Sequence, residues 1–174
     1  MSKHYLFSLI ALIGLSSGYS CFGSPKDGDK APDFTTQDEQ GKSYKLSDLI
    51  GQKVALYFYP SDHSFSYGCS LQACSIRDGF SDLKEAGITV LGMSKGSAKQ
   101  KKHFSEKRHL PFPLLKSTNE ILELYVVKGD FWSLYLPKRH TFLIDERGII
   151  VKIITSVDVR NHAQQIIDGF AQEK

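Results

Sequence analysis

Two cysteines, Cys69 and Cys74, stand where sulfur chemistry is favoured. Cys69 follows an apolar run that ends at Pro60 and a polar loop of residues 61–68, and we expect it to open a helix. The unpaired amides and the dipole of a helix N-terminus stabilise the thiolate, which is the reactive form of cysteine. Open α/β sheets also place their sites at the carboxyl ends of strands, where this loop lies. The sequence therefore predicts a reactive thiol at Cys69.

The spacing of the two thiols constrains how they can react with each other. Cys74 lies five residues after Cys69, inside the same predicted helix. Helical residues five apart have Cα atoms about 8.6 Å apart and face about 140° away from each other. A disulfide tolerates only about 4.4–6.8 Å between Cα atoms. The two sulfurs can bond only after the start of the helix unwinds, which favours a reaction cycle over a permanent disulfide.

Two segments resemble a known family. The runs Tyr57–Cys74 (YFYPSDHSFSYGCSLQAC) and Arg139–Asp145 (RHTFLID) resemble the bacterioferritin comigratory protein or Q-type subfamily of peroxiredoxins, and the resemblance covers about Gly28–Phe170. The most specific part is Cys-Ser-Leu-Gln-Ala-Cys, which matches the subfamily's C-T-x-Q-A-C. The resemblance implies a single thioredoxin-like domain over residues 28–174, an α/β fold with a central mixed sheet flanked by helices. It also implies a thiol peroxidase that acts on hydrogen peroxide and organic hydroperoxides without a metal or bound cofactor.

The same resemblance assigns roles to individual residues. Cys69 is expected to attack the peroxide, and Cys74 to resolve the sulfenic acid as an intramolecular disulfide. Ser66 would orient the peroxide, and the Arg139 guanidinium would stabilise the thiolate and the charge on the departing oxygen. The other expected site residues are the loop proline Pro60, Gly68 and Gln72. Thioredoxin or a thioredoxin-like reductant would restore the thiols by exchange.

The loop departs from the family pattern. The family has P-x3-[T/S]-x2-C, whereas here five residues separate Pro60 from Ser66, and Tyr67 replaces the usual proline before Gly68. Ser64 restores the spacing to Pro60 but misses the spacing to Cys69. We expect Ser66 rather than Ser64 to orient the peroxide, because the spacing between this hydroxyl residue and the reacting Cys69 matters most.

Two other functions use the same cysteines. A thiol–disulfide oxidoreductase acting on protein disulfides needs only the reactive pair. A copper-binding chaperone or a zinc site could combine the cysteines with His63 or His140. Zinc sites, however, normally show a second ligand pair, which this sequence lacks.

The N-terminus has the build of a secretory signal peptide over residues 1–20. Lys3 and His4 precede the apolar run Tyr5–Leu15, which small residues follow. Cleavage after Ser20 would leave Cys21 first, either lipidated as in a bacterial lipoprotein or as a spare thiol. We expect an exported monomer in the periplasm or anchored to the membrane at Cys21, and a cytoplasmic one if the leader is not used.

Composition agrees with one folded domain. The 174 residues are 41% hydrophobic and 24% charged, which excludes a disordered tail, a collagen-like fibre and a polytopic membrane protein. A net charge of +3 gives no case for a nucleic-acid partner. The lysines of Lys95–Arg108 are best explained as a solvated helix face, and Phe131, Trp132 and Tyr135 as core packing.

Strands and helices are expected to alternate along the chain. Apolar runs predict strands at Val54–Tyr59, Ile88–Met93 and Thr141–Ile144, and a turn at Glu146–Gly148 predicts a hairpin with Ile149–Thr155. Helices are predicted at Cys69–Ala86, Ala98–His109, Asn119–Val126 and His162–Ala171, with Ser97 as the N-cap of the second and Gly87 ending the first. This order predicts a layered α/β sheet that is parallel in part.

Overall fold

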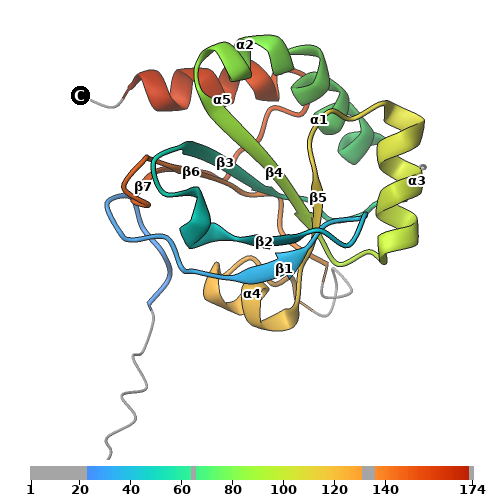
Figure 1. The fold of residues 1–174 in the computed structure, drawn as a ribbon, viewed down its shortest axis with the longest axis horizontal. Coiled ribbons are helices and arrows are strands. Elements are labelled where there is room, and N and C mark those ends of the chain that lie inside the picture. The colour runs from blue at the N-terminus through green and yellow to red at the C-terminus, as the bar shows by residue number, and fades with distance from the viewer. Residues whose placement is uncertain (1–22, 64–65, 131–135, 173–174) are drawn as a thin grey trace, which may run out of the picture.

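A five-stranded mixed sheet forms the centre of the computed structural model, which describes residues 23–63, 66–130 and 136–172. The strand order is β5-β4-β3-β6-β7, and a separate two-stranded ribbon pairs β1 with β2 (Figure 1). The strands are β1 (Thr35–Gln37), β2 (Ser43–Lys45), β3 (Lys53–Phe58), β4 (Ile88–Ser94), β5 (Leu114–Lys116), β6 (Thr141–Ile144) and β7 (Ile150–Ile154). The helices are η1 (Leu46–Leu49), α1 (Tyr67–Asp78), α2 (Phe80–Glu85), α3 (Ala98–Arg108), α4 (Asn119–Leu124) and α5 (His162–Ala171).

Strand β3 lies in the middle of the sheet and joins its parallel and antiparallel halves. It pairs in parallel with β4 and antiparallel with β6. Strand β4 continues the parallel half to β5, and β6 and β7 form the predicted antiparallel hairpin. The prediction of a central mixed sheet flanked by helices is confirmed.

Both faces of the sheet are covered. As a result, β3 is buried along nearly its whole length. Its alternate side chains enter two hydrophobic cores, as period-2 geometry requires. One core holds Ala55, Tyr57 and Tyr59 with residues of α1, α2, α3 and α5. The other holds Val54, Leu56 and Phe58 with residues of the N-terminal segment and α4. Figure 1 shows α1, α2 and α5 on one side of the sheet and α4 with the β1-β2 ribbon on the other.

The first predicted helix is in fact two helices. It starts at Tyr67, two residues before Cys69, and ends at Asp78. Gly79 separates it from α2, and a Cβ at Gly79 would lie only 2.5 Å from the Cβ of Ala163 on α5. Gly87, predicted to end the helix, lies in the turn after α2 with a positive φ of 71°. Because α5 approaches this position so closely, the residue there is glycine, which is a poor helix former. The helix that was predicted to be continuous is therefore interrupted at Gly79.

The remaining predictions differ from the structure mainly at element ends. The strand at Thr141–Ile144 and the helix at His162–Ala171 agree fully, and Ser97 caps α3 through a capping box with Gln100. The short strands β1, β2 and β5 were not predicted, since three residues give little periodicity. The predicted aromatic cluster of residues 131–135 and the predicted signal peptide lie outside the described residues.

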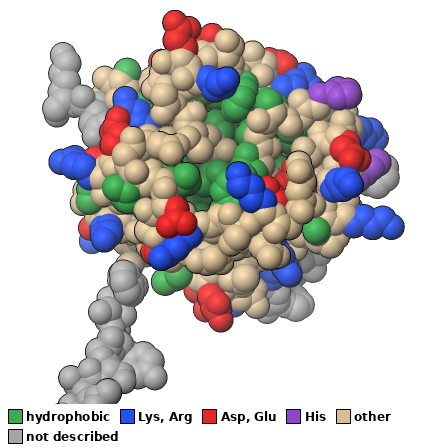
Figure 2. All heavy atoms as spheres, in the orientation of Figure 1, with side chains coloured by type: hydrophobic (Ala, Val, Ile, Leu, Met, Phe, Trp, Pro, Cys, Tyr) green, Lys and Arg blue, Asp and Glu red, His purple; other side chains and the backbone are tan. Residues whose placement is uncertain are grey.

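Helix α3 carries most of the basic stretch that was predicted to be a solvated face. Figure 2 shows His side chains and several basic (Lys or Arg) side chains on the side of the molecule where Figure 1 places α3. Lys99, Lys102 and Lys107 are exposed as expected, but Lys101 is completely buried, which corrects the prediction for that residue. Among the described residues, no helix is both long and apolar enough to cross a bilayer.

Candidate active site

Cys69 lies in the first turn of α1, directly after the loop that follows β3. Its side chain is 2% exposed and belongs to the core between the sheet and the helices. Ser66 is the N-cap residue of α1, but its hydroxyl makes no capping hydrogen bond. The hydroxyl therefore remains available to a ligand one helical turn before the sulfur.

A guanidinium group faces the Cys69 sulfur. Arg139, in the segment that leads into β6, donates a hydrogen bond from Nη2 to the Cys69 Sγ over 3.3 Å. Gly68 borders the same group, since a Cβ there would lie 3.5 Å from the Arg139 Nη2, an ordinary contact distance. The sulfur therefore faces a hydrogen-bond donor that carries a positive charge.

Gln72 fixes the orientation of this arginine. It lies one turn after Cys69 on α1 and is completely buried. Its Oε1 accepts a hydrogen bond from Nη1 of Arg139. The guanidinium therefore bridges Gln72 and Cys69 with two different nitrogen atoms.

Cys74 is half-buried on the same helix, and both Cys69 and Cys74 are free thiols. Arg77 lies beside it: a hydrogen bond to Asp78 raises the pKa of Arg77, and the charge of a Cys74 thiolate adds to that shift. Because α1 is continuous from Tyr67 to Asp78, the two thiols cannot meet without unwinding.

The structure brings four of the predicted site residues together and places Ser66, Cys74 and Pro60 apart from them. Cys69, Gln72 and Arg139 are linked by hydrogen bonds, with Gly68 against the guanidinium. Ser66 precedes them by a turn, whereas Cys74 lies further along the helix. Pro60 is at the other end of the loop, in the wall of a hollow of about 350 Å³ that His63, Lys95 and Leu136 also line. Ser64, the alternative to Ser66, lies outside the described residues.

The loop between Pro60 and Ser66 has a buried polar anchor that the sequence did not reveal. The Asp62 carboxylate accepts hydrogen bonds from Tyr59 and Ser94, and the Lys101 ammonium lies 3.1 Å from its Oδ2. Burial lowers the pKa of Lys101, and Asp62 opposes that shift. A lysine among other lysines looks like a solvated residue in the sequence, so only the position of Asp62 explains its burial.

His162 was also missed. Its ring is completely buried at the start of α5, with Nδ1 3.1 Å from the Gln72 Nε2 and Nε2 3.0 Å from the Thr141 Oγ1. No spacing links His162 to Gln72, which is 90 residues away in the chain. A histidine among the apolar residues of an amphipathic helix was the only available signal.

A metal centre has no set of ligands in the described part of the chain. No three His, Cys, Asp or Glu side chains there are grouped so that they could hold a metal ion. The cysteines therefore form no such group with His63 or His140, the histidines considered in the sequence. Burial, followed by the charge of Lys138, lowers the pKa of His140.

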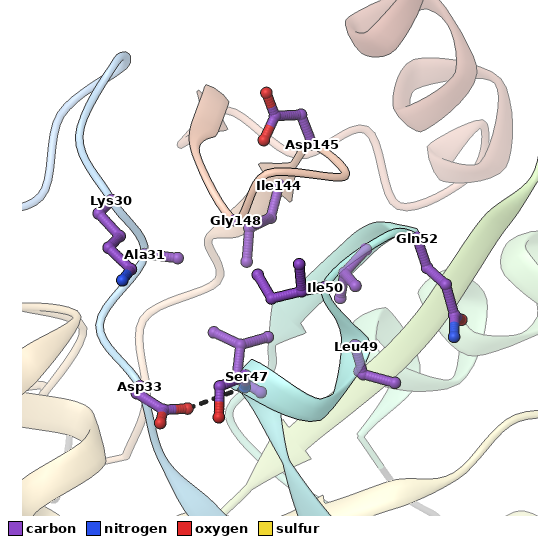
Figure 3. A pocket seen from close by; sticks show the side chains of 12 residues that line it. Lys30, Ala31, Asp33, Ser47, Leu49, Ile50, Gln52, Ile144, Asp145 and Gly148 are labelled. Atoms are coloured by element: carbon purple, nitrogen blue, oxygen red, sulfur yellow. Dashed lines mark hydrogen bonds between the residues drawn. The ribbon is translucent and has the colours of Figure 1, made fainter.

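A second cavity, of about 100 Å³, lies away from the thiols (Figure 3). Apolar side chains, among them Leu46, Ile50 and Ile144, form much of its wall. In Figure 3 the one dashed line joins the Ser47 amide to Asp33, over 2.9 Å. None of the predicted site residues lines this cavity.

The chain as a whole is similar to known proteins. Residues 28–153 match the AhpC/TSA family. The chain is 43% identical over 145 residues to a Coxiella burnetii protein assigned to the peroxiredoxins under the name bcp, covering 80% of this chain and 95% of that protein. It is 34% identical over 145 residues to the peroxiredoxin Bcp of Bacillus subtilis, covering 80% and 91% of the two chains.

Solved structures give the same result. The peroxidoxin BcpB of Mycobacterium tuberculosis superposes with a TM-score of 0.77 at 27% identity, over 86% of this chain and 99% of that one. The C47S mutant of Xylella fastidiosa PrxQ also gives a TM-score of 0.77, at 26% identity, over 86% and 97% of the two chains. These likenesses confirm the expected thioredoxin-like fold.

Proposed function

Because this chain belongs to the AhpC/TSA family and is a peroxiredoxin of the Bcp/Q type, we propose that Cys69 attacks the peroxide and that Cys74 resolves the product. One observation carries this assignment: the Arg139 Nη2 lies 3.3 Å from the Cys69 Sγ. Cys69 is also the more deeply buried of the two thiols in the described part of the chain.

The first step transfers one peroxide oxygen to sulfur. The Cys69 thiolate attacks the nearer oxygen, the O–O bond breaks, and the departing alkoxide or hydroxide takes up a proton as alcohol or water. Cys69 becomes a sulfenic acid. Arg139 stabilises the thiolate and the charge on the departing oxygen, since its guanidinium stays protonated throughout. Ser66 orients the peroxide with the hydroxyl that the helix does not use.

The second step forms a disulfide. The Cys74 thiolate attacks the Cys69 sulfenic sulfur, and the hydroxyl leaves as water after taking up a proton. This step requires the turns of α1 between the two residues to unwind, because the intact helix holds their Cα atoms about 8.6 Å apart. A dithiol then reduces the disulfide by exchange. We propose thioredoxin or a thioredoxin-like protein as its source.

Export is a further part of the proposal. Residues 1–20 would be removed as a signal peptide, and the mature chain would work in the periplasm as a monomer, free or lipidated at Cys21. Cell fractionation with mass analysis of the mature N-terminus tests this. An intact N-terminus in the cytoplasmic fraction would contradict it.

The decisive experiment uses the full chain with Cys21→Ser, reduced and freed of reductant. One equivalent of hydrogen peroxide should remove two hydrogen atoms from the protein within seconds, as read by intact mass spectrometry. Peptide mapping should locate the new bond between Cys69 and Cys74. If both thiols survive while a protein disulfide is reduced instead, thiol–disulfide exchange is the better description.

A further inference from the structure

A continuous chain of hydrogen bonds runs from helix α5 to the Cys69 sulfur. Arg139 donates to Cys69 with one nitrogen and to the Gln72 Oε1 with another. The Gln72 Nε2 lies 3.1 Å from the His162 Nδ1, and the His162 Nε2 lies 3.0 Å from the Thr141 Oγ1. Gln72, Thr141 and His162 are completely buried, so water does not compete for these bonds.

The direction of every bond in this chain follows from the arginine. A guanidinium only donates, so Gln72 must turn its oxygen toward Arg139 and its NH₂ toward His162. The His162 Nδ1 must then be the unprotonated acceptor. The proton of the neutral ring is on Nε2, which donates to Thr141. Burial, and then the nearby charge of Arg139, lowers the pKa of His162 to about 3, which is consistent with this neutral form.

His162 is itself held firmly against α1. Its backbone N–H donates to the Ser75 Oγ over 2.8 Å, which satisfies an amide at the start of α5 that Asn161 does not cap. Its ring packs edge-on against Tyr57, with centroids 6.0 Å apart. Since Ser75 lies one turn after Gln72, His162 of α5 forms hydrogen bonds to α1 at two successive turns.

Gln72 is in the segment that the proposed disulfide must disturb. It stands between Cys69 and Cys74, so unwinding that brings the sulfurs together must move its side chain away from His162. A buried hydrogen bond lost in this way leaves polar groups unpaired, which is unfavourable. The same bond therefore favours the helical form of the site and opposes the unwound form.

We propose that His162 is a positioning residue that acts through Gln72 and affects the two chemical steps in opposite directions. It speeds peroxide attack, because it fixes Gln72 and hence Arg139 beside Cys69. It slows disulfide formation, because it holds the turns of α1 that must unwind. This inference rests on the proposed function and assigns a role in it to α5.

Two matched substitutions separate the two sides of the histidine ring. In His162→Asn the amide oxygen can stand where Nδ1 stands, which keeps the bond to Gln72. In His162→Gln the longer amide reaches the position of Nε2, which keeps the bond to Thr141 and loses the one to Gln72. Both variants bury a neutral amide, so they differ mainly in which neighbour they bind.

The experiment follows both steps in the full chain by stopped-flow fluorescence and quenched thiol labelling after a peroxide pulse. His162→Gln should slow sulfenic acid formation about tenfold and speed disulfide formation about tenfold, whereas His162→Asn should stay within about twofold of the wild type in both. Adding Gln72→Met should make the two His162 variants equal, because the link through which they act is gone. If His162→Gln does not fold, His162→Leu replaces it, with the same expected rates.

Opposite changes in the two rates distinguish positioning from a merely structural role, which would lower the melting temperature without that pattern. Unchanged rates in His162→Gln, or rates that change in the same direction, would overturn the inference. So would a difference between the His162 variants that persists with Gln72→Met. A wild type that forms no sulfenic acid at all would overturn the proposed function instead, and the two failures are therefore distinct.

Discussion

Asp62 and Lys101 form a buried ion pair beneath the loop that leads to Cys69. The Lys101 Nζ lies 3.1 Å from the Asp62 Oδ2, and each side chain is 1% exposed. The carboxylate fits only because residue 96 is a glycine, since a Cβ at Gly96 would lie 1.8 Å from the same Asp62 oxygen. The loop is thus fixed to β4 and α3 between Pro60 and Ser66.

Lys101→Met should destabilise the protein by about 3–5 kcal/mol, because it leaves the Asp62 carboxylate buried without its partner. Urea unfolding measures this loss. Lys102→Met is the matched control, and because its side chain is exposed it should change the free energy of unfolding by less than about 0.5 kcal/mol. Equal effects of the two substitutions would mean that the ion pair does not hold the loop.

Arg139→Met should slow the oxidation of Cys69 by peroxide about 10²–10³-fold, since the group that stabilises the departing oxygen is lost. The rate is read from the change in intrinsic fluorescence after mixing with peroxide. Lys138→Met removes a neighbouring exposed charge and should leave this rate within about twofold of the wild type. A comparable loss in both variants would indicate a general effect of charge.

Ser66→Ala should slow the same step by about 10²-fold, because the peroxide loses a hydroxyl that orients it. Ser64→Ala tests the alternative spacing and should have little effect. The reverse result would transfer the role to Ser64. Both variants are compared at one peroxide concentration, in the linear range of the wild-type rate.

Cys69→Ser should abolish peroxide consumption, whereas Cys74→Ser should consume about one equivalent and stop as the sulfenic acid. A dimedone adduct on Cys69, detected by mass spectrometry, would identify that product. Continued turnover of Cys74→Ser with thioredoxin would show that resolution does not need Cys74.

Acidification should destabilise the fold through His162. The unfolded histidine has a pKa near 6.5, while burial and then the charge of Arg139 lower the folded value to about 3, against a smaller opposing effect of Asp158. Above pH 6.5 the ring is neutral in both states and stability is unaffected. Between pH 6.5 and 3 only the unfolded chain takes up the proton, so the free energy of unfolding falls by up to about 1.4 kcal/mol per pH unit.

Urea unfolding at pH 7, 5.5 and 4.5 measures this effect. The ring contacts Gln72, Tyr57 and Thr141, and the charges that act on it are those of Arg139 and Asp158. His162→Asn lacks the ionisable group and should lose less stability than the wild type, by about 1.4 kcal/mol between pH 5.5 and 4.5. Parallel curves for the two proteins would show that His162 does not keep its lowered pKa.

The sequence predicts most of the sheet and the position of Cys69, because β3 and the loop after it are strong local patterns. The contact between Arg139 and Cys69 spans 70 residues, so only the family resemblance indicated it. Periodicity could not predict the burial of Lys101, since a lysine surrounded by lysines has the signature of a solvated face. Its environment is set by Asp62, 39 residues earlier, in a loop without regular structure.

The chain of bonds through His162 was not predictable for a similar reason. Its members come from α1, β6, the segment before β6 and α5, and only the packing of these elements brings them within hydrogen-bond distance. The predicted end of the first helix was wrong for the same reason, since Gly79 interrupts the helical pattern where Ala163 approaches from α5. Local patterns therefore predict the framework, and tertiary contacts determine how the site is tuned.

The break at Gly79 also limits how far along the chain the proposed unwinding of α1 can extend. Helix α1 has only twelve residues, and α2 starts anew after the glycine. Under the proposed cycle, oxidation unwinds part of α1, and the break at Gly79 keeps that unwinding from continuing along the helix into α2. A reductase would then distinguish the oxidised from the reduced enzyme by the shape of α1 and of its contact with α5.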